Sequence, residues 1–212
     1  MSETPIATDD GTMDQSAHAG VTGLVLAGGL GRRMGGVDKG LQLLRGEPMV
    51  MHVLRRLAPQ VDAVLVNANQ NADAYASIAA PFDARVVPDI VGGFAGPLAG
   101  LHAGLAAATT PLLVTVPCDS PFLPGDLVAR LRAAIDSDGA QIAVAKTGTQ
   151  AHPVFALVDV SVRENLAAFL ESGGRKIDAW YAALRLVEVA FDDEAEAFEN
   201  INTRDELKAF ER

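Results

Sequence analysis

Short apolar runs recur along this chain from residue 21 onward, and the stretches between them show helical periodicity. Runs of this length are typical of buried strands, and strands that alternate with helical stretches indicate crossover connections. Because a crossover helix returns the chain to the same end of the sheet, the two strands that it joins run parallel. The sequence therefore predicts an α/β fold with a mostly parallel central sheet. The expected strands are 21–27, 63–67, 84–87, 111–116, 142–145, 154–157 and 186–191.

Helix starts are marked in three places. Pro48 precedes a segment whose apolar residues share one helical face, and Pro124 with Asp126 precedes another. Near the end of the chain, Thr203 is followed three residues later by Glu206, which is the pattern of a capping box. We therefore expect helices after each of these points.

The length and composition favour one globular domain over residues 21–212. With 212 residues, 49% of them hydrophobic and 21% charged, the chain can bury a core but is short for two domains. Residues 1–20 are polar and acidic and lack the apolar segment of a secretory signal, so we expect a disordered leader. The uncharged stretch 90–118 is interrupted by glycine and proline, which argues against a membrane helix.

The formal net charge of −10 argues against a nucleic-acid partner, because such partners are held by clustered basic residues. Most of this negative charge lies in residues 1–20 and 192–212, and the segment between them is nearly neutral. A small anionic substrate is therefore compatible with the central segment.

A glycine-rich segment follows the first expected strand. Five glycines lie between residues 28 and 36, and Arg32, Arg33 and Lys39 add three cations. Glycines let backbone N–H groups approach a ligand closely, so such a loop forms a concave site for phosphates. A flexible turn with solvated basic residues is the alternative. The coincidence of a strand end, bare amides and clustered cations favours the phosphate site.

Two common phosphate-binding patterns do not fit this segment. A Walker loop has its lysine after the last glycine, whereas Lys39 precedes Gly40. A dinucleotide-binding loop has a third glycine at the position where Met34 stands. The segment therefore belongs to neither class.

The segment does resemble the opening of the nucleotidyltransferases, with Leu-Ala-Gly-Gly at 26–29 followed after three residues by Arg-Met-Gly at 33–35. Its continuation at 36–41 is similar to that of the molybdenum cofactor guanylyltransferase family. The resemblance implies a three-layer, Rossmann-like nucleotidyltransferase fold with a mostly parallel sheet flanked by helices. It also implies a nucleotide-binding half at about 21–125 and an acceptor-binding half at about 126–212.

Asp119 follows the strand expected at 111–116. Ligands of open α/β sheets bind beyond the carboxyl ends of the strands. Mg²⁺ is held in such sites by one or two carboxylates together with phosphate oxygens and water. Asp119 is therefore a candidate magnesium ligand, although an aspartate at a strand end also commonly caps a turn.

The resemblance implies further roles in nucleotide binding. Asn67 and Asp89 end the second and third expected strands, where an amide can both donate and accept and a carboxylate can accept from guanine. Apart from the resemblance, both are ordinary loop-forming residues. The implied GTP-binding residues are Leu26, Ala27, Gly28, Gly29, Lys39, Asn67, Asp89 and Asp119, and the implied catalytic residues are Arg33, Lys39 and Asp119.

The second half of the chain resembles the family over shorter strings. By this resemblance, Arg175 and Lys176 would hold the phosphate of a molybdopterin acceptor, and the amides of Asn200 and Asn202 would bind its pterin. The alternative is structural, because basic pairs are usually solvated and asparagines often organise a helix cap.

The resemblance implies transfer of GMP from GTP to the phosphate of molybdopterin, with Mg²⁺ as the cofactor and pyrophosphate as the product. A phosphate monoester is already anionic near neutral pH, so the reaction needs alignment and charge screening more than activation of the nucleophile. Three alternatives stay open: a molybdopterin cytidylyltransferase, a sugar-phosphate nucleotidyltransferase, and a non-catalytic GTP-binding delivery partner.

Cys118 is the only cysteine, so an internal disulfide is excluded and a reducing cytoplasm fits the chain. We expect a monomer that makes transient contacts with molybdopterin-delivering proteins or molybdoenzyme chaperones. We expect no contact with nucleic acid or membrane.

Overall fold

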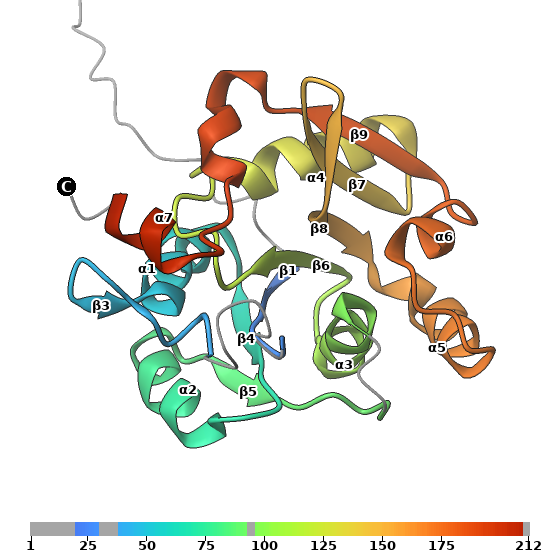
Figure 1. The fold of residues 1–212 in the computed structure, drawn as a ribbon. Coiled ribbons are helices and arrows are strands. Elements are labelled where there is room, and N and C mark those ends of the chain that lie inside the picture. Colours follow the sequence, from blue (N-terminus) through green and yellow to red (C-terminus); the bar gives the residue numbers. More distant parts are fainter. Residues whose placement is uncertain (1–19, 30–37, 93–95, 210–212) are drawn as a thin grey trace, which may run out of the picture.

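A computed structural model describes residues 20–29, 38–92 and 96–209, in which a seven-stranded sheet forms the centre (Figure 1). The expected leader, apart from Gly20, lies outside the described residues, as does the part of the glycine-rich segment that contains Arg32 and Arg33. In sheet order the strands are β5 (Arg85–Val87), β4 (Ala63–Asn67), β1 (Val21–Leu26), β6 (Leu112–Pro117), β8 (Gln150–Asp159), β7 (Ile142–Thr147) and β9 (Leu186–Ala190).

All strands of this sheet run parallel except β8. The pairs β5–β4, β4–β1, β1–β6 and β7–β9 are parallel, whereas β8 pairs antiparallel with both β6 and β7. The tight turn between β7 and β8 contains Gly148 at a φ of 54°, and so short a connection can only join antiparallel strands. The prediction of a mostly parallel sheet is confirmed.

Helices cover both faces of the sheet (Figure 1). One face is covered by α1 (Met49–Leu57), α2 (Ala72–Ala79) and α4 (Leu127–Asp138), and the other by α3 (Pro97–Ala107), α5 (Arg163–Glu171) and α6 (Ile177–Tyr181). Neighbouring strand residues face opposite sides, so Val25 packs with the first group and Leu24 with the second. The expected three-layer, Rossmann-like architecture is therefore confirmed.

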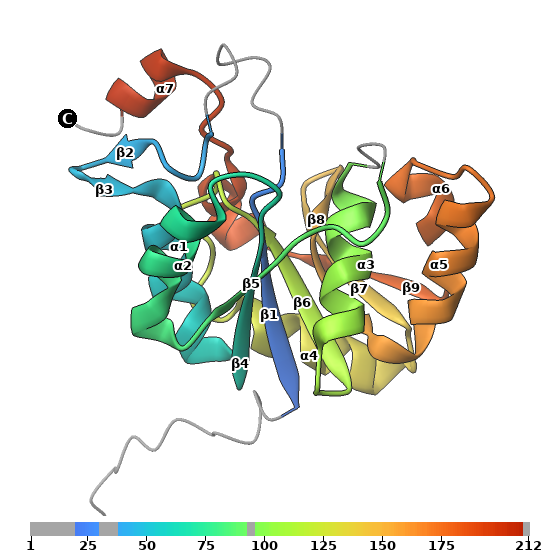
Figure 2. The same ribbon diagram turned by 90° about the horizontal axis from the view of Figure 1, so that it is seen from below.

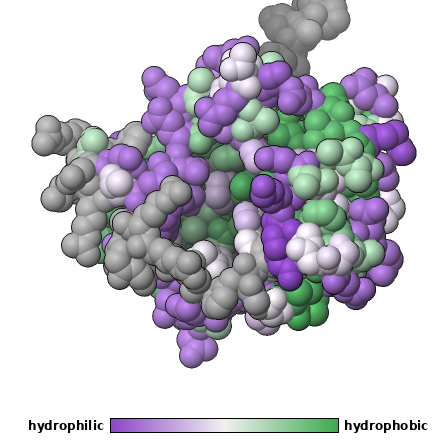
Figure 3. All heavy atoms as spheres, turned by 45° about the vertical axis from the view of Figure 1, so that its right-hand side comes forward, coloured by the Kyte–Doolittle hydropathy of each residue, from purple (hydrophilic) through white to green (hydrophobic). Residues whose placement is uncertain are grey.

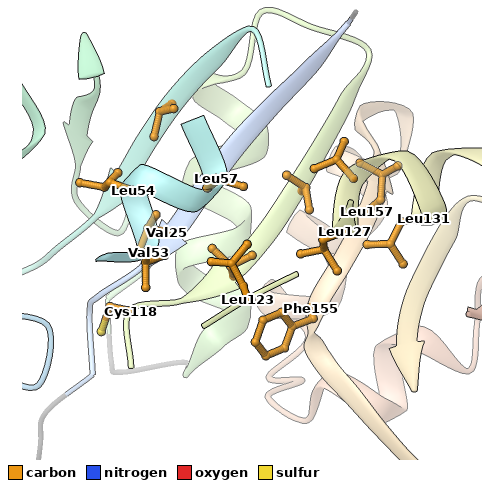
Figure 4. Close-up of a cluster of buried hydrophobic side chains, with 14 of the residues drawn as sticks. Val25, Val53, Leu54, Leu57, Cys118, Leu123, Leu127, Leu131, Phe155 and Leu157 are labelled. Atoms are coloured by element: carbon orange, nitrogen blue, oxygen red, sulfur yellow. The ribbon is translucent and has the colours of Figure 1, made fainter. Parts of the chain in front are cut away.

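The core on the first face joins the two halves of the sheet (Figure 4). Val25 of β1 lies near Val53 of α1, while Leu127 of α4 lies near Leu157 of β8. Leu123, from the segment between β6 and α4, lies between these two groups and is fully buried. Burial of a leucine side chain contributes about 1.5–3 kcal/mol, so this continuous cluster stabilises both halves together.

The three expected helix starts are all present. Asp126 is the N-cap residue of α4, although its side chain makes no capping hydrogen bond. Before α7 (Arg204–Ala209), the Glu206 backbone N–H donates to the Thr203 hydroxyl at 3.1 Å, and the Thr203 N–H donates to the Glu206 carboxylate at 3.2 Å. The predicted capping box is therefore confirmed.

Several short elements complete the chain. An antiparallel hairpin, β2 (Leu43–Leu44) and β3 (Glu47–Pro48), precedes α1 and was not expected from the apolar pattern. Among the described residues, the short 3₁₀ helices are η3 (Ala58–Gln60), η4 (Ala80–Phe82), η5 (Val160–Val162) and η6 (Asp192–Phe198). The longest helix in the described part of the chain, α4, has 12 residues, and none there could cross a bilayer.

Candidate functional site

The carboxyl ends of β1, β4, β5 and β6 meet at one edge of the sheet, at the top of Figure 2. Hydrogen bonds extend this edge beyond the strands, because Ala27 N–H donates to Asn67 O at 2.8 Å and Cys118 N–H to Leu26 O at 3.1 Å. The order of strands along the chain reverses between β1 and β6, which makes their carboxyl ends a topological switch point. The loops that follow these strands therefore face one site.

Lys39 and Asp119 meet at this edge although 80 residues separate them. The Lys39 ammonium donates to the Asp119 carboxylate at 2.9 Å and to the Asn202 side-chain oxygen at 2.6 Å. The side chains of Lys39 and Asp119 are 21% and 12% exposed, so the ion pair is largely shielded from bulk water. The structure thus unites the implied catalytic lysine, the candidate metal ligand and one implied acceptor residue.

The donors around Asp119 fit a metal that is held mainly by substrate. In the described residues, no three His, Cys, Asp or Glu side chains gather as a metal-binding cluster. Asp119 uses one carboxylate oxygen for Lys39, and its backbone oxygen accepts from Ile201 N–H at 2.9 Å. A single carboxylate with phosphate oxygens and water is the coordination that Mg²⁺ accepts.

Asn67 and Asp89 form the second cluster at this edge, together with Asn69. The Asn67 amide donates to Asp89 Oδ1 at 2.9 Å, and the Asn69 amide donates to Asp89 Oδ2 at 2.8 Å. Asp89 N–H returns a bond to Asn69 Oδ1 at 2.8 Å, which closes a ring. Asn69 therefore fixes the plane of the Asp89 carboxylate, a role that the sequence analysis missed.

Two glycines pack directly against this amide cluster. A Cβ on Gly28 would lie 2.8 Å from Asn69 Nδ2, and one on Gly100 would lie 2.4 Å from Asn67 Oδ1. Gly28 follows β1 and Gly100 lies in the first turn of α3, so bare backbone from two elements encloses Asn67. Gly28 thus lies beside Asn67, another of the implied nucleotide-binding residues.

Asp38 anchors the segment that carries Lys39. Its carboxylate accepts hydrogen bonds from the hydroxyl of Tyr75 and from the Asn71 amide, the latter at 3.0 Å. Tyr75 is 1% exposed, and burial raises its pKa well above the usual value, so its hydroxyl remains a donor. The sequence analysis gave Asp38 no role, although its position next to Lys39 is a usable signal.

Asn200 and Asn202 lie on the segment between η6 and α7. The buried hydroxyl of Ser120 donates to Asn200 Oδ1 at 2.5 Å, so Asn200 is tied to the residue that follows Asp119. The Asn202 amide donates to the Asn200 backbone oxygen at 3.2 Å. Of the two asparagines predicted for acceptor binding, Asn200 therefore contacts the loop that carries Asp119, and Asn202 contacts Lys39.

A cavity of about 690 Å³ adjoins these asparagines. His152 stands in its wall, with its ring stacked on Phe198 at 4.8 Å and within 2.7 Å of the Thr147 hydroxyl. Burial lowers the pKa of His152 below its ordinary value. The cavity is lined by Pro117, Thr147, Gln150, Ala151, His152, Pro153, Val154, Phe155, Ala195, Phe198, Glu199, Asn200, Asn202 and Glu206.

The front of the molecule is visibly hollowed, with many hydrophilic residues around the hollow (Figure 3).

The remaining predicted residues lie elsewhere or outside the description. Arg175 and Lys176 are not among the residues that line this cavity. The Arg175 guanidinium donates to the backbone oxygens of Leu170 and Gly174, at 2.8 and 2.7 Å, and so caps the end of α5. Arg33 lies outside the described residues. Cys118 is buried beside Asp119, and burial raises its pKa, which leaves the thiol protonated and unreactive.

A mostly parallel sheet with Gly28, Lys39 and Asp119 at its switch point is typical of α/β proteins that bind nucleotides. Residues 23–187 match the model of the MobA-like NTP transferase domain. The chain belongs to this family and is a nucleotidyltransferase.

Curated relatives agree over nearly the whole chain. It is 54% identical to a molybdenum cofactor guanylyltransferase from Burkholderia ambifaria strain MC40-6 over 205 residues, which cover 94% of this chain and 100% of the relative. It is 56% identical to a protein of the same name from Cupriavidus taiwanensis over 200 residues, or 92% of this chain and 98% of that one.

Solved structures confirm the fold. Molybdopterin-guanine dinucleotide biosynthesis protein A from Archaeoglobus fulgidus superposes with a TM-score of 0.72 at 27% identity, over 90% of this chain and 96% of that one. A 4-diphosphocytidyl-2C-methyl-D-erythritol synthase from Anaerococcus prevotii gives 0.71 at 11% identity, over 92% and 96% of the two chains, and supports the fold alone.

Proposed function

We propose that this chain transfers GMP from GTP to the phosphate of molybdopterin, forming the guanine dinucleotide cofactor and releasing pyrophosphate. The observation that carries the proposal is the meeting of Lys39 and Asp119 at the switch point, next to a cavity large enough for an acceptor. The names of the curated relatives give the nucleotide and the acceptor.

In this reaction a phosphate oxygen of molybdopterin attacks the α-phosphorus of GTP. The new bond joins that oxygen to phosphorus, and the bond between the α-phosphorus and the bridging oxygen of pyrophosphate breaks. The leaving pyrophosphate takes the electron pair, and no covalent enzyme intermediate is required.

Lys39 and Asp119 have distinct parts in this proposal. Lys39, together with Arg33 and the amides of Gly28 and Gly29, would stabilise charge on the leaving pyrophosphate. Asp119 would hold Mg²⁺, which when bound screens the charge of the α-phosphate. Nucleotidyltransferases generally use a divalent metal, and the choice of Mg²⁺ rests on the hard oxygen donors that this site offers.

We place guanine at the cluster of Asn67 and Asp89, with Leu26 and Ala27 at the base of the nucleotide site. The Asp89 carboxylate has unused lone pairs beside its two amide partners, so it can also accept from the guanine N–H groups. The two proposed halves, 21–125 and 126–212, would then bind nucleotide and acceptor respectively.

We place the acceptor in the cavity, with its pterin at the amides of Asn200 and Asn202. The position of Lys39 beside Asn202 supports this placement, because the attacking phosphate must reach the nucleotide. Arg175 and Lys176 remain proposed contacts only for a part of the acceptor that extends beyond the cavity.

We further propose a cytoplasmic monomer that receives molybdopterin from delivering proteins and passes its product to molybdoenzyme chaperones. A single buried cysteine supports a reducing compartment.

A panel of GTP, CTP, ATP and UTP, read as pyrophosphate release with molybdopterin present, tests the function. If GTP is the only nucleotide of the panel that releases pyrophosphate, guanylyl transfer is supported. If CTP is the only one, the protein is a cytidylyltransferase. A parallel series with sugar 1-phosphates tests the other acceptor class. GTP binding without release in any series would support a non-catalytic delivery partner and contradict the proposal.

A further inference from the structure

Three hydrogen bonds tie the segment 200–202 to the nucleotide side of the site. Ser120 donates to the Asn200 side chain at 2.5 Å, Ile201 N–H donates to the backbone oxygen of Asp119 at 2.9 Å, and Lys39 donates to Asn202 at 2.6 Å. The first two bonds hold this segment next to the loop that carries Asp119 and Ser120. The third connects the implied catalytic lysine to a residue that lines the cavity.

The Asn202 side chain is engaged at both of its polar atoms. Its oxygen accepts from Lys39, and its amide nitrogen donates to the backbone oxygen of Asn200 at 3.2 Å. Its backbone N–H is also used, by the Glu206 carboxylate at 2.7 Å. The bond from Lys39 therefore occupies the side-chain oxygen of Asn202, which an N–H group of the bound molybdopterin would otherwise contact.

The phosphates of a bound nucleotide compete for the same ammonium. A hydrogen bond between an ammonium and an oxyanion is roughly twice as strong as one between neutral partners, and phosphate offers a stronger acceptor than an amide oxygen. Lys39 has three N–H donors, of which Asp119 and Asn202 take two. Of its two described partners, the neutral Asn202 oxygen is the weaker hydrogen-bond acceptor, so it is the one that phosphates drawing the ammonium toward themselves would displace.

We propose that Asn202 couples the two substrate sites, so that nucleotide binding frees its side-chain oxygen for the acceptor and the nucleotide binds first. The inference rests on the proposed function, because it takes the nucleotide phosphates as the ligand of Lys39. Asn202 is a positioning residue in this scheme, since it acts on the nucleotide through Lys39. The coupling is reciprocal, so the acceptor in turn strengthens nucleotide binding.

Calorimetric titration of the whole chain with molybdopterin, with and without saturating Mg²⁺ and α,β-methylene-GTP, measures this coupling. The analogue cannot release pyrophosphate, so only binding is observed. In the unaltered protein we expect the analogue to tighten acceptor binding by at least about fivefold, the lower end of usual couplings. In Asn202→Ala the ratio should fall to about one.

A second readout separates coupling from a merely structural role. Asn202→Ala removes the competitor of the nucleotide, so the analogue alone should bind as tightly as before or more tightly. A structural defect would weaken the analogue as well. Gln150→Ala is the matched control, because Gln150 lines the same cavity. That variant should weaken acceptor binding equally with and without the analogue, which leaves the ratio unchanged.

Asn202→Asp covers the case in which the alanine variant fails to fold. It keeps an acceptor for Lys39 and makes it anionic, so the analogue should bind more weakly while the coupling persists. A ratio of one in the unaltered protein, or an undiminished ratio in Asn202→Ala, would overturn the inference. If the unaltered protein shows no coupling but still releases pyrophosphate from GTP with molybdopterin present, the proposed function stands and only the coupling fails.

Discussion

Gly40 lies so close to Tyr75 that any side chain at position 40 would overlap the Tyr75 hydroxyl. A Cβ on Gly40 would lie 2.5 Å from the Tyr75 hydroxyl oxygen but 3.3 Å from the nearest ring carbons. That hydroxyl donates to Asp38, the residue before Lys39. The absence of a side chain at Gly40 thus permits the anchor that positions the lysine.

This contact predicts a non-additive pair of substitutions. Gly40→Ala should destabilise the protein by about 1–3 kcal/mol, because the methyl group overlaps a fully buried hydroxyl. Tyr75→Phe should cost about 1 kcal/mol through the lost hydrogen bond to Asp38. In the double variant the overlap is gone, so urea unfolding should show a smaller loss than the sum of the two. Strict additivity would contradict the contact.

The sequence predicts the strands well because their apolar runs are buried on both faces of the sheet, as Leu24 and Val25 illustrate. It also predicts that Asp119 follows a strand, and the family resemblance assigns that residue and Lys39 to one catalytic site. The structure adds partners that carry no local pattern. Asn69, Tyr75 and Ser120 are placed by tertiary contacts. Their partners lie 20, 37 and 80 positions away along the chain, respectively.

The cavity illustrates the same limit. Its wall comes from the β7–β8 hairpin and from η6, which approach one another only when the sheet has formed. No spacing in the sequence brings His152 and Phe198 together, yet their rings stack. Arg175, which the resemblance assigns to the acceptor, bonds to the end of α5, a contact that no local pattern indicates.

Gly100→Ala should impair nucleotide binding through Asn67. Alanine usually stabilises a helix by about 1 kcal/mol relative to glycine, so an open site in α3 would gain stability. At Gly100, however, the added Cβ would lie 2.4 Å from Asn67 Oδ1 and 2.6 Å from Leu26 Cδ2. We expect weaker GTP binding by at least about tenfold, which is a cost of about 1.4 kcal/mol.

Gly104→Ala is the matched control for that experiment. Gly104 lies in the same helix as Gly100. A Cβ on Gly104 would lie 2.4 Å from Cδ2 of Leu24 in β1, away from Asn67. Both variants should lower the midpoint of thermal unfolding, but Gly104→Ala should retain its affinity for GTP once folded. If Gly100→Ala and Gly104→Ala lose equal affinity for GTP, the loss comes from altered packing of α3 and not from contact with Asn67.

Asp119→Asn should separate catalysis from folding. The substitution keeps an oxygen that can accept from Lys39 but removes the negative charge that a divalent metal requires. We expect kcat to fall by at least about a hundredfold with little change in the free energy of unfolding. Asp136→Asn, at an exposed ion pair with Arg132 on α4, should leave kcat unchanged. Full turnover by Asp119→Asn in saturating Mg²⁺ would exclude Asp119 as the metal ligand.

His152 should make the stability of the protein depend on pH. Burial lowers its pKa in the folded protein below the ordinary value of 6.5, so the unfolded chain takes up a proton first as the pH falls. The contribution of neutral His152 is thus complete above pH 6.5 and is lost as the pH falls toward the lower, folded pKa. Urea unfolding at pH 7.5 and pH 5.5 measures this loss, since carboxylates ordinarily protonate below that window. His152→Phe retains an aromatic ring against Phe198 but cannot take up a proton, so it should lose less stability between the two pH values. If the two proteins lose equal stability, His152 does not titrate in this range.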